Sequence, residues 1–155
     1  MSEVSMHDLA FAVNGEQRSL QVEPRELLID VLRNQLGLTG TKRSCDVQVC
    51  GACTVLVDGQ PTSACSTLAV EADGCAVQTI EGLAKDGRMD RIQQAFLDHG
   101  ALQCGFCTPG FVMAVHALLT QHEKPDDATI RHYLHGNICR CTGYVKIIEA
   151  VKSLV

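Results

Sequence analysis

Two short stretches in the C-terminal half, residues 103–110 (QCGFCTPG) and residues 137–144 (NICRCTGY), decide how this chain is organised. Each stretch carries two cysteines, and together they form what we call the second cysteine group: Cys104, Cys107, Cys139 and Cys141. Neither pair can complete a four-coordinate site alone, but together they supply four thiolates. Because a helical pattern follows each stretch, we expect the C-terminal half to be helices that bring the two corners together.

The N-terminal half holds another set of four cysteines at a different spacing. Reading Cys-x4-Cys-x2-Cys-x11-Cys, this first cysteine group consists of Cys45, Cys50, Cys53 and Cys65. A gap of four, a gap of two and a distant fourth cysteine is the plant-type [2Fe–2S] spacing. Gly51 and Ala52 are small, so backbone N–H groups can approach sulfur and favour the reduced state of a cluster.

Structural zinc is the alternative metal for both groups. Structural zinc sites usually take their ligands as two Cys-x2-Cys-like pairs on separate turns. The gap of four residues and the tight turn from Cys50 to Cys53 fit that pattern poorly. The second group, with its pairs separated by 31 residues, fits either zinc or an iron–sulfur cluster on spacing alone.

Charge and composition argue against a nucleic-acid-binding protein and against a membrane-spanning one. The chain has 155 residues, enough for one medium domain or two small ones, and a net charge of −5 that argues against nucleic acid as a partner. No stretch approaches the ~20 apolar residues that a membrane span needs. Residues 1–8 (MSEVSMHD) show no basic region, apolar run or twin arginine, so we expect a cytoplasmic protein. In a reducing compartment, nine clustered cysteines are more often metal ligands than disulfides.

The N-terminal half has the pattern of a small α+β unit. Apolar alternation predicts strands over residues 9–13 and 18–22, joined by a type I′ turn at Asn14-Gly15. A helix with Pro24 in its first turn should follow and end at Gly37. A loop then runs to Cys53, and short strands are expected over residues 54–57, 60–65 and 76–80, with the helix lying across a mixed sheet.

Beyond residue 81 the apolar period becomes helical. We expect a first helix over residues 89–99, and three more that are capped by Thr108, with Pro109 at the first helical position, by Asp126 and by Thr142. The last helix should carry one apolar face, made of Val145, Ile148, Val151 and Leu154. Four short helices with brief connections predict a compact bundle. The predicted domains are therefore residues 1–81 and residues 82–155.

Three motifs in order carry a resemblance to a known family. Residues 45–55 (CDVQVCGACTV), 103–110 and 137–144 resemble the iron–sulfur subunit of the molybdenum hydroxylases, the superfamily of xanthine dehydrogenase, aldehyde oxidoreductase and carbon monoxide dehydrogenase. The resemblance runs from about Leu9 to the C-terminus. Ser44 and Gln48 stand where many members have glycine, so Gln48 should bear strain if that position needs a positive φ.

The resemblance implies a β-grasp ferredoxin-like domain followed by a four-helix domain. Each would hold one [2Fe–2S] cluster, the first on Cys45, Cys50, Cys53 and Cys65, the second on Cys104, Cys107, Cys139 and Cys141. Gln103 matches a residue that hydrogen-bonds molybdopterin, and the Cys139 segment matches one that lies near it.

The same resemblance implies two partner proteins. One is a large subunit that binds molybdopterin, and the other is a medium subunit that binds FAD, or another acceptor protein. Electrons would pass from molybdenum to the second cluster, then to the first cluster and to FAD. The chain is too short for a molybdopterin or FAD site of its own, so we expect an electron-transfer subunit with no catalytic residues.

Several other residues have plain structural explanations. We expect Cys75 to be a small buried residue and Phe106 to pack between helices. The pair His132 and His135 should be solvated or lie at an interface, and Lys42 and Arg43 should be solvated. Two further classes of protein compete with the main hypothesis: a free-standing ferredoxin and a zinc-stabilised binding module.

Overall fold

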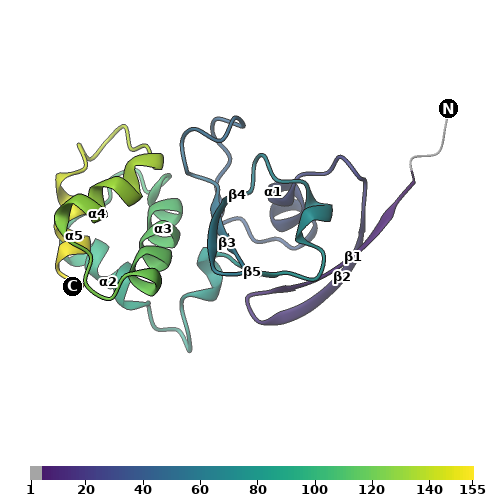
Figure 1. Ribbon diagram of the computed structural model, residues 1–155, viewed down its shortest axis with the longest axis horizontal. Helices are drawn as coiled ribbons and strands as arrows, with labels where there is room; N and C mark the ends of the chain where they lie inside the picture. The colour runs from purple at the N-terminus through teal and green to yellow at the C-terminus, as the bar shows by residue number, and fades with distance from the viewer. Residues whose placement is uncertain (1–4) are drawn as a thin grey trace.

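The computed structural model describes residues 5–155 and places a small mixed sheet beside a set of helices (Figure 1). Residues 1–4, which belong to the segment inspected above for a signal sequence, lie outside the described residues. The strands are β1 (His7–Val13), β2 (Glu16–Val22), β3 (Thr54–Val57), β4 (Gln60–Ser63) and β5 (Ala76–Gln78). The helices are α1 (Leu28–Asp30), α2 (Arg91–Asp98), α3 (Thr108–Gln121), α4 (Asp127–Tyr133) and α5 (Val145–Lys152). Shorter turns of helix are η1 (Val31–Gln35), η2 (Ala69–Ala72), η3 (Ile80–Gly82) and η4 (Leu134–Gly136).

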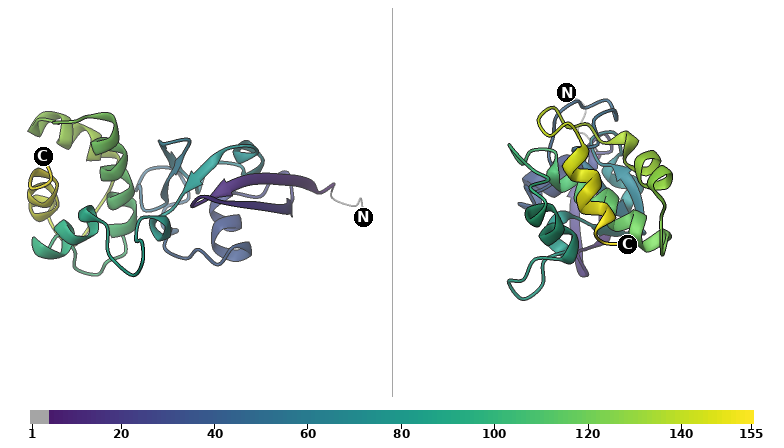
Figure 2. Two further views of the ribbon diagram at one scale, coloured as in Figure 1. Left: turned by 90° about the horizontal axis from the view of Figure 1, so that it is seen from below. Right: turned by 90° about the vertical axis from the view of Figure 1, so that its left-hand side faces the viewer.

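The N-terminal hairpin forms as its turn sequence predicts. Asn14 and Gly15 both take positive φ, 52° and 84°, the geometry of a type I′ turn. β1 and β2 pair antiparallel from His7 opposite Val22 to Val13 opposite Glu16. Figure 2 shows this hairpin at one end of the molecule and helix α5 at the other.

The sheet has the strand order β2-β1-β5-β3-β4 and is mixed, as expected. β5 runs parallel to β1 and antiparallel to β3, so the chain crosses from the hairpin to the cysteine-bearing loop and returns to the middle of the sheet. The core beneath it joins strand residues such as Leu9, Phe11 and Val55 to Leu28 and Leu32 of the helical segment. These features make the chain an α+β protein of the ferredoxin-like type.

The first helix differs from its prediction. Helical geometry begins only at Leu28, and the chain around Pro24 forms a turn instead of a first helical turn. Leu27 pairs with Leu68 as an isolated β-bridge and is itself extended, so the helix cannot begin before Leu28. The helix widens to a π-helix at η1, and Gly37 follows with a φ of +69°.

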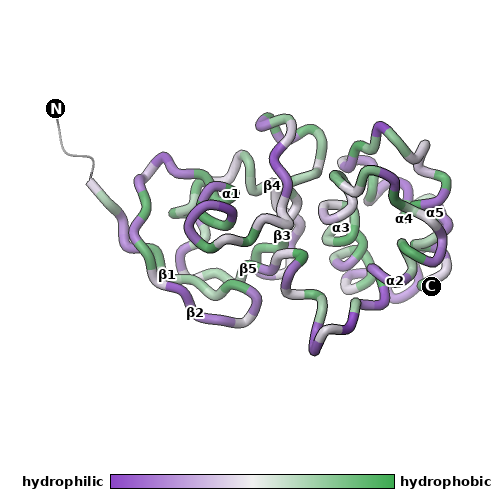
Figure 3. Tube along the Cα trace, turned by 180° about the vertical axis from the view of Figure 1, so that it is seen from behind, coloured by the Kyte–Doolittle hydropathy of each residue, from purple (hydrophilic) through white to green (hydrophobic). Residues whose placement is uncertain are grey.

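The C-terminal half consists of α2 to α5 around an apolar core. Asp126 caps α4 by accepting a hydrogen bond from the Thr129 N–H at 2.8 Å, which confirms the predicted cap. α3 begins at Thr108 with Pro109 in its first turn, one residue earlier than expected, and Cys107 takes the capping position. Figure 3 shows α3 drawn largely in hydrophobic colours, consistent with its eight buried residues.

Three predictions about side chains in this half are wrong. Thr142 does not cap the last helix, because α5 begins at Val145 after Tyr144 and has no side-chain cap. Phe106 is 46% exposed and does not pack between helices. Val145 is 62% exposed, because Ile147 and Ile148 take the inward positions of α5 instead.

Helix α3 joins the two halves. It lies between the other helices and the strands β3 and β4 (Figure 1), and Leu56 of β3 belongs to the helical core. At Gly110 an added Cβ would lie 2.1 Å from the carbonyl oxygen of Gly51, so α3 touches the cysteine-bearing loop backbone to backbone. Only glycine allows that approach.

No helix within residues 5–155 combines the length and apolar character that crossing a bilayer requires.

Candidate metal centres

The first cysteine group is carried by the long loop between η1 and β3 and by the end of β4. Cys53 and Cys65 are buried at 2% and 3% exposure, whereas Cys45 and Cys50 are half-buried at the outer end of the loop. Two backbone N–H groups, those of Val49 and Cys50, each donate to Cys45 Sγ at 3.4 Å. The loop therefore folds around one of its own sulfurs.

The second cysteine group lies where two helix-flanking corners meet. Cys104 and Cys141 are exposed and their sulfurs are 3.7 Å apart, while Cys139 is buried. All four of these cysteines line one surface pocket of about 250 Å³, and Cys50 of the first group lines it too. The packing of helices has thus gathered thiols from positions up to 37 residues apart.

Within each group the thiols lie near enough to affect one another. Cys65 and Cys50 both act on the pKa of Cys53 in the first group. In the second group Cys139 and Cys104 both act on the pKa of Cys107, and Cys104 Sγ lies 3.7 Å from Cys141 Sγ. Among residues 5–155, no three His, Cys, Asp or Glu side chains gather as a single-ion site requires.

The local surroundings give these thiols different proton affinities. Backbone N–H donors, with Val47 first, lower the pKa of Cys45 to about 6. Burial raises the pKa of Cys53 and that of Cys107 to about 12. Burial opposes ionisation of Cys139 as well, but hydrogen bonds from Thr142, Cys141 and Cys107 together outweigh it and lower the pKa of that thiol. A thiol that binds metal must lose its proton, so donors directed at sulfur favour the ligand form.

The two cysteine groups are joined by hydrogen bonds. The Ile138 N–H donates to the Cys50 carbonyl oxygen at 2.9 Å, and Ile138 directly precedes Cys139. Next to it, the buried Asn137 side chain donates from Nδ2 to the Gly51 carbonyl oxygen at 3.1 Å. The segments that carry the two groups are therefore in direct backbone contact.

Strained backbone marks the first loop. Gln48 has a φ of 57°, which confirms that this position takes the left-handed conformation, and Asp46 has a φ of 55°. Arg43 holds the loop by pairing with Asp30 of α1 and, at 2.8 Å, with Asp46. Arg43 was expected to be solvated, and its ion pairs show that it has a structural role instead.

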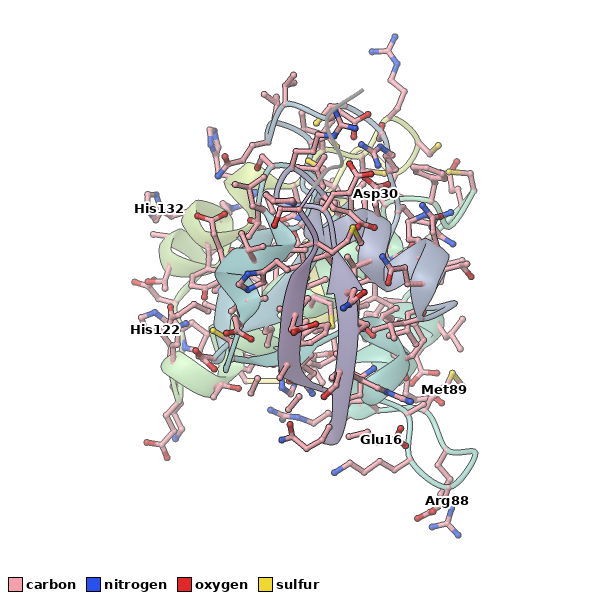
Figure 4. The ribbon with its side chains drawn as sticks, turned by 90° about the vertical axis from the view of Figure 1, so that its right-hand side faces the viewer. Glu16, Asp30, Arg88, Met89, His122 and His132 are labelled. Carbon is pink, nitrogen blue, oxygen red and sulfur yellow. The ribbon has the colours of Figure 1, made fainter. Side chains whose placement is uncertain are left out.

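The other residues singled out from the sequence belong to neither cysteine group. Gln103 is exposed next to Cys104. Cys75 stands outside both groups and is half-buried, with its thiol near the Glu71 and Asp73 carbonyls, so the prediction that it is buried is wrong. His132 is exposed and projects from the edge of the molecule in Figure 4.

Sequence reasoning missed the contacts that join the two groups. Asn137, Ile138 and Gly110 all lie within or beside the quoted motifs, but nothing in their spacing shows that they meet Cys50 and Gly51. The small residues at 51, 52 and 110 were the available signal for a close backbone approach.

Comparison with known families and proteins fits this geometry. The family described as "2Fe-2S iron-sulfur cluster binding domain" matches residues 11–90, and the "[2Fe-2S] binding domain" family matches residues 79–152. The nicotinate dehydrogenase small FeS subunit of Eubacterium barkeri is 47% identical over 143 residues, 92% of this chain and 91% of that protein. The xanthine dehydrogenase iron-sulfur-binding subunit of Escherichia coli O157:H7 is 48% identical, over 90% of this chain and 88% of that protein. The chain belongs to the iron–sulfur subunits of the molybdenum hydroxylases.

A solved structure agrees with this membership. Quinoline 2-oxidoreductase from Pseudomonas putida 86 contains a chain that superposes with a TM-score of 0.92 at 44% identity, covering 95% of this chain and 91% of that one. As a molybdenum hydroxylase iron–sulfur subunit, the chain is a [2Fe–2S]-binding part of an oxidoreductase and not a catalyst on its own.

Proposed function

We propose that this subunit relays electrons from the molybdopterin of a large partner subunit, through two [2Fe–2S] clusters, to the FAD of a medium partner subunit. The observation that carries the proposal is the 2.9 Å hydrogen bond from the Ile138 N–H to the Cys50 carbonyl. It connects a residue of the first cysteine group to the neighbour of Cys139 in the second. A continuous path of bonds between two redox sites suits electron transfer, whereas two independent structural sites need none.

The number of cysteines in each group matches the number of ligands of one [2Fe–2S] cluster. Cys45, Cys50, Cys53 and Cys65 would hold the first cluster, and Cys104, Cys107, Cys139 and Cys141 the second. A [2Fe–2S] cluster takes four cysteine thiolates over two irons, and each group supplies four. The two [2Fe–2S]-binding families that match residues 11–90 and 79–152 support iron–sulfur clusters over zinc.

Each half of the chain would form a domain of its own. We assign residues 1–81 to a β-grasp domain and residues 82–155 to a four-helix bundle. The boundary is supported by a fixed turn, because Asn14 hydrogen-bonds Thr79 in both directions and Glu81 accepts from the Gly40 N–H at 2.7 Å. The linker between the domains is therefore anchored to the sheet half.

The two ends of the relay would face different partners. Gln103, Cys104 and Cys141 are exposed together, and we place the large molybdopterin-binding subunit over them, with Gln103 and the Cys139 segment nearest the pterin. Val47 and Val49 of the first loop are 66% and 58% exposed, which suits a covered contact with the FAD subunit or another acceptor. We place the assembled complex in the cytoplasm, where a reducing environment keeps thiols available as metal ligands.

Purification of the chain with its native partners tests the proposal. We expect co-purification with a larger molybdenum-containing subunit, about four iron atoms per chain, and two [2Fe–2S] signals in electron paramagnetic resonance (EPR) after reduction. A fully expressed monomer with iron and no partners would indicate a free ferredoxin. A colourless protein with zinc would indicate a binding module, and either result would exclude the relay.

A further inference from the structure

The side chain of Thr142 makes an unusual contact with the second cysteine group. Its hydroxyl donates a hydrogen bond to Cys139 Sγ at 3.1 Å, and its backbone N–H reaches the same sulfur at 3.4 Å. Within residues 5–155, no other side-chain oxygen donates to a sulfur of either cysteine group. The helical pattern predicted that Thr142 would cap α5. In the structure α5 has no side-chain cap, and the Thr142 hydroxyl bonds to sulfur instead.

The direction of the hydrogen bond between Thr142 and Cys139 follows from the state of the sulfur. A cysteine that binds a cluster is a thiolate and carries no proton, so only the hydroxyl can donate. The Tyr144 N–H donates to Thr142 Oγ1 at 3.3 Å and so occupies one of its two lone pairs. The hydroxyl therefore acts as a donor toward the sulfur.

Tyr144 holds the turn in place from the other side. It takes a left-handed conformation with a φ of 68°, which is costly for an aromatic residue. Its hydroxyl accepts the Cys139 N–H at 3.0 Å, and its ring packs edge-on against Phe111 of α3 with centroids 6.3 Å apart. Residues 139–144 thus form a closed turn in which Thr142 has little freedom to leave the sulfur.

The position of Cys139 gives this contact a functional consequence. Cys139 is the buried member of the second group, and the residue before it makes the hydrogen bond to Cys50. Hydrogen bonds to the sulfurs of an iron–sulfur cluster stabilise its more negative, reduced state and so raise its reduction potential. A donor on Cys139 acts on the cluster at the point where the two groups are joined.

We propose that Thr142 is a positioning residue. Through its hydrogen bond to Cys139, its hydroxyl raises the reduction potential of the cluster in the second cysteine group. This inference rests on the proposed function, because it requires a [2Fe–2S] cluster at that site. Raising the potential of the second cluster makes it a better acceptor for electrons that arrive from the molybdenum side.

A redox titration of the complete complex, followed by EPR, tests the proposal. We compare the wild type with Thr142→Val, which removes the hydroxyl at nearly constant volume, and Thr142→Ser, which keeps it. Thr142→Val should lower the equilibrium constant for reducing the second cluster by about tenfold, which is about 59 mV for one electron. Thr142→Ser and the first cluster in every variant should keep their wild-type potentials.

Two further variants complete the design. Thr120→Val is a matched control, since its hydroxyl donates to the His116 carbonyl within α3 and meets no sulfur. Cys141→Ala identifies which EPR signal belongs to the second cluster. Thr120→Val should leave both potentials unchanged.

The outcomes separate this inference from the proposed function. If Thr142→Val keeps the wild-type potential, or if Thr142→Ser shifts as far as Thr142→Val, the inference is wrong while the relay stands. If both Thr142→Val and a second variant, Thr142→Ala, lose the second cluster altogether, Thr142 is needed for assembly and the potential-setting role is overturned. If the wild-type complex itself shows fewer than two [2Fe–2S] signals, the proposed function fails.

Discussion

The two cysteine groups gather their four thiols by different physical routes. Three thiols of the first group lie within nine residues of one loop, and backbone N–H groups of that loop point at Cys45. The second group takes its thiols from two corners that only helix packing brings together, and a side-chain hydroxyl points at Cys139. A site built within one loop depends mainly on local backbone geometry, whereas a site built between corners depends on the core that holds them.

Removal of one thiol should separate the groups most sharply. Cys45→Ala should abolish the first [2Fe–2S] signal and keep the second, and Cys141→Ala should do the reverse, because alanine offers no ligand. Iron content should fall from about four to about two atoms per chain in each variant. EPR of the reduced complex and iron analysis provide the measurements.

Cys75→Ala is the matched control for both thiol variants, because Cys75 lies outside both groups. It should keep both signals and all the iron. Loss of iron from the Cys75 variant, or loss of the wrong signal from either of the others, would contradict the division into two groups of four.

A methyl group at Gly110 should break the contact on which both groups depend. Its Cβ would lie 2.1 Å from the Gly51 carbonyl oxygen, so α3 must move away from the first loop. We expect Gly110→Ala to lower the free energy of unfolding by about 3 kcal/mol, as overpacking of a tight contact does. Chemical unfolding of the iron-loaded protein measures this change.

Gly136→Ala is the control for that experiment, since an added Cβ there meets nothing within 4 Å. It should change the free energy of unfolding by less than about 0.5 kcal/mol, as most surface substitutions do. Equal stability of the two alanine variants would mean that the two halves do not need this close approach.

The side chain of Asn137 should have a smaller effect on the same junction. Asn137→Ala removes the buried hydrogen bond to the Gly51 carbonyl, which still accepts from the N–H and hydroxyl of Thr54. Because no buried acceptor is left without a partner, we expect a loss of only about 1–2 kcal/mol in unfolding free energy. Asn34→Ala, at an exposed position of η1, should cost less than half of this in the same unfolding experiment.

Unchanged stability of Asn137→Ala would show that backbone contacts alone hold the junction. The junction would then depend on the hydrogen bond from the Ile138 N–H to the Cys50 carbonyl and on the close approach at Gly110.

Relief of strain at Gln48 should give the smallest change and affect only the first group. Gln48→Gly removes the cost of a left-handed residue, about 1 kcal/mol, and gives up one exposed hydrogen bond from Ser66. The first cluster should therefore release its iron more slowly on heating, with no change at the second. Gln48→Ala keeps the strain and should not stabilise, so faster iron loss from the glycine variant than from the alanine variant would contradict the strain argument.

Local features of the fold were predictable because neighbouring residues determine them. The type I′ turn at Asn14 and Gly15, the Asp126 cap and the strand from Thr54 to Val57 all depend on backbone preferences within a few residues. The left-handed conformation of Gln48 was also anticipated, from the glycine that relatives carry there.

Features that depend on distant partners were not predictable in the same way. Thr142 had a good local reason to cap a helix, but Tyr144 packs against Phe111 of α3, and in the resulting turn the Thr142 hydroxyl donates to Cys139 instead. Pro24 had a good local reason to begin a helix, but Leu27 is held extended by its bridge to Leu68. Phe106 is apolar, and only the arrangement of helices shows that it stays at the surface.

The sequence by itself indicated two groups of four cysteines, because spacing along a chain limits which thiols can meet. Only the tertiary structure decided that the sulfurs of Cys104 and Cys141 lie 3.7 Å apart, and that the Ile138 N–H meets the Cys50 carbonyl. Those contacts depend on how closely α3 approaches the first loop at Gly110, a distance that is set by packing across the whole molecule.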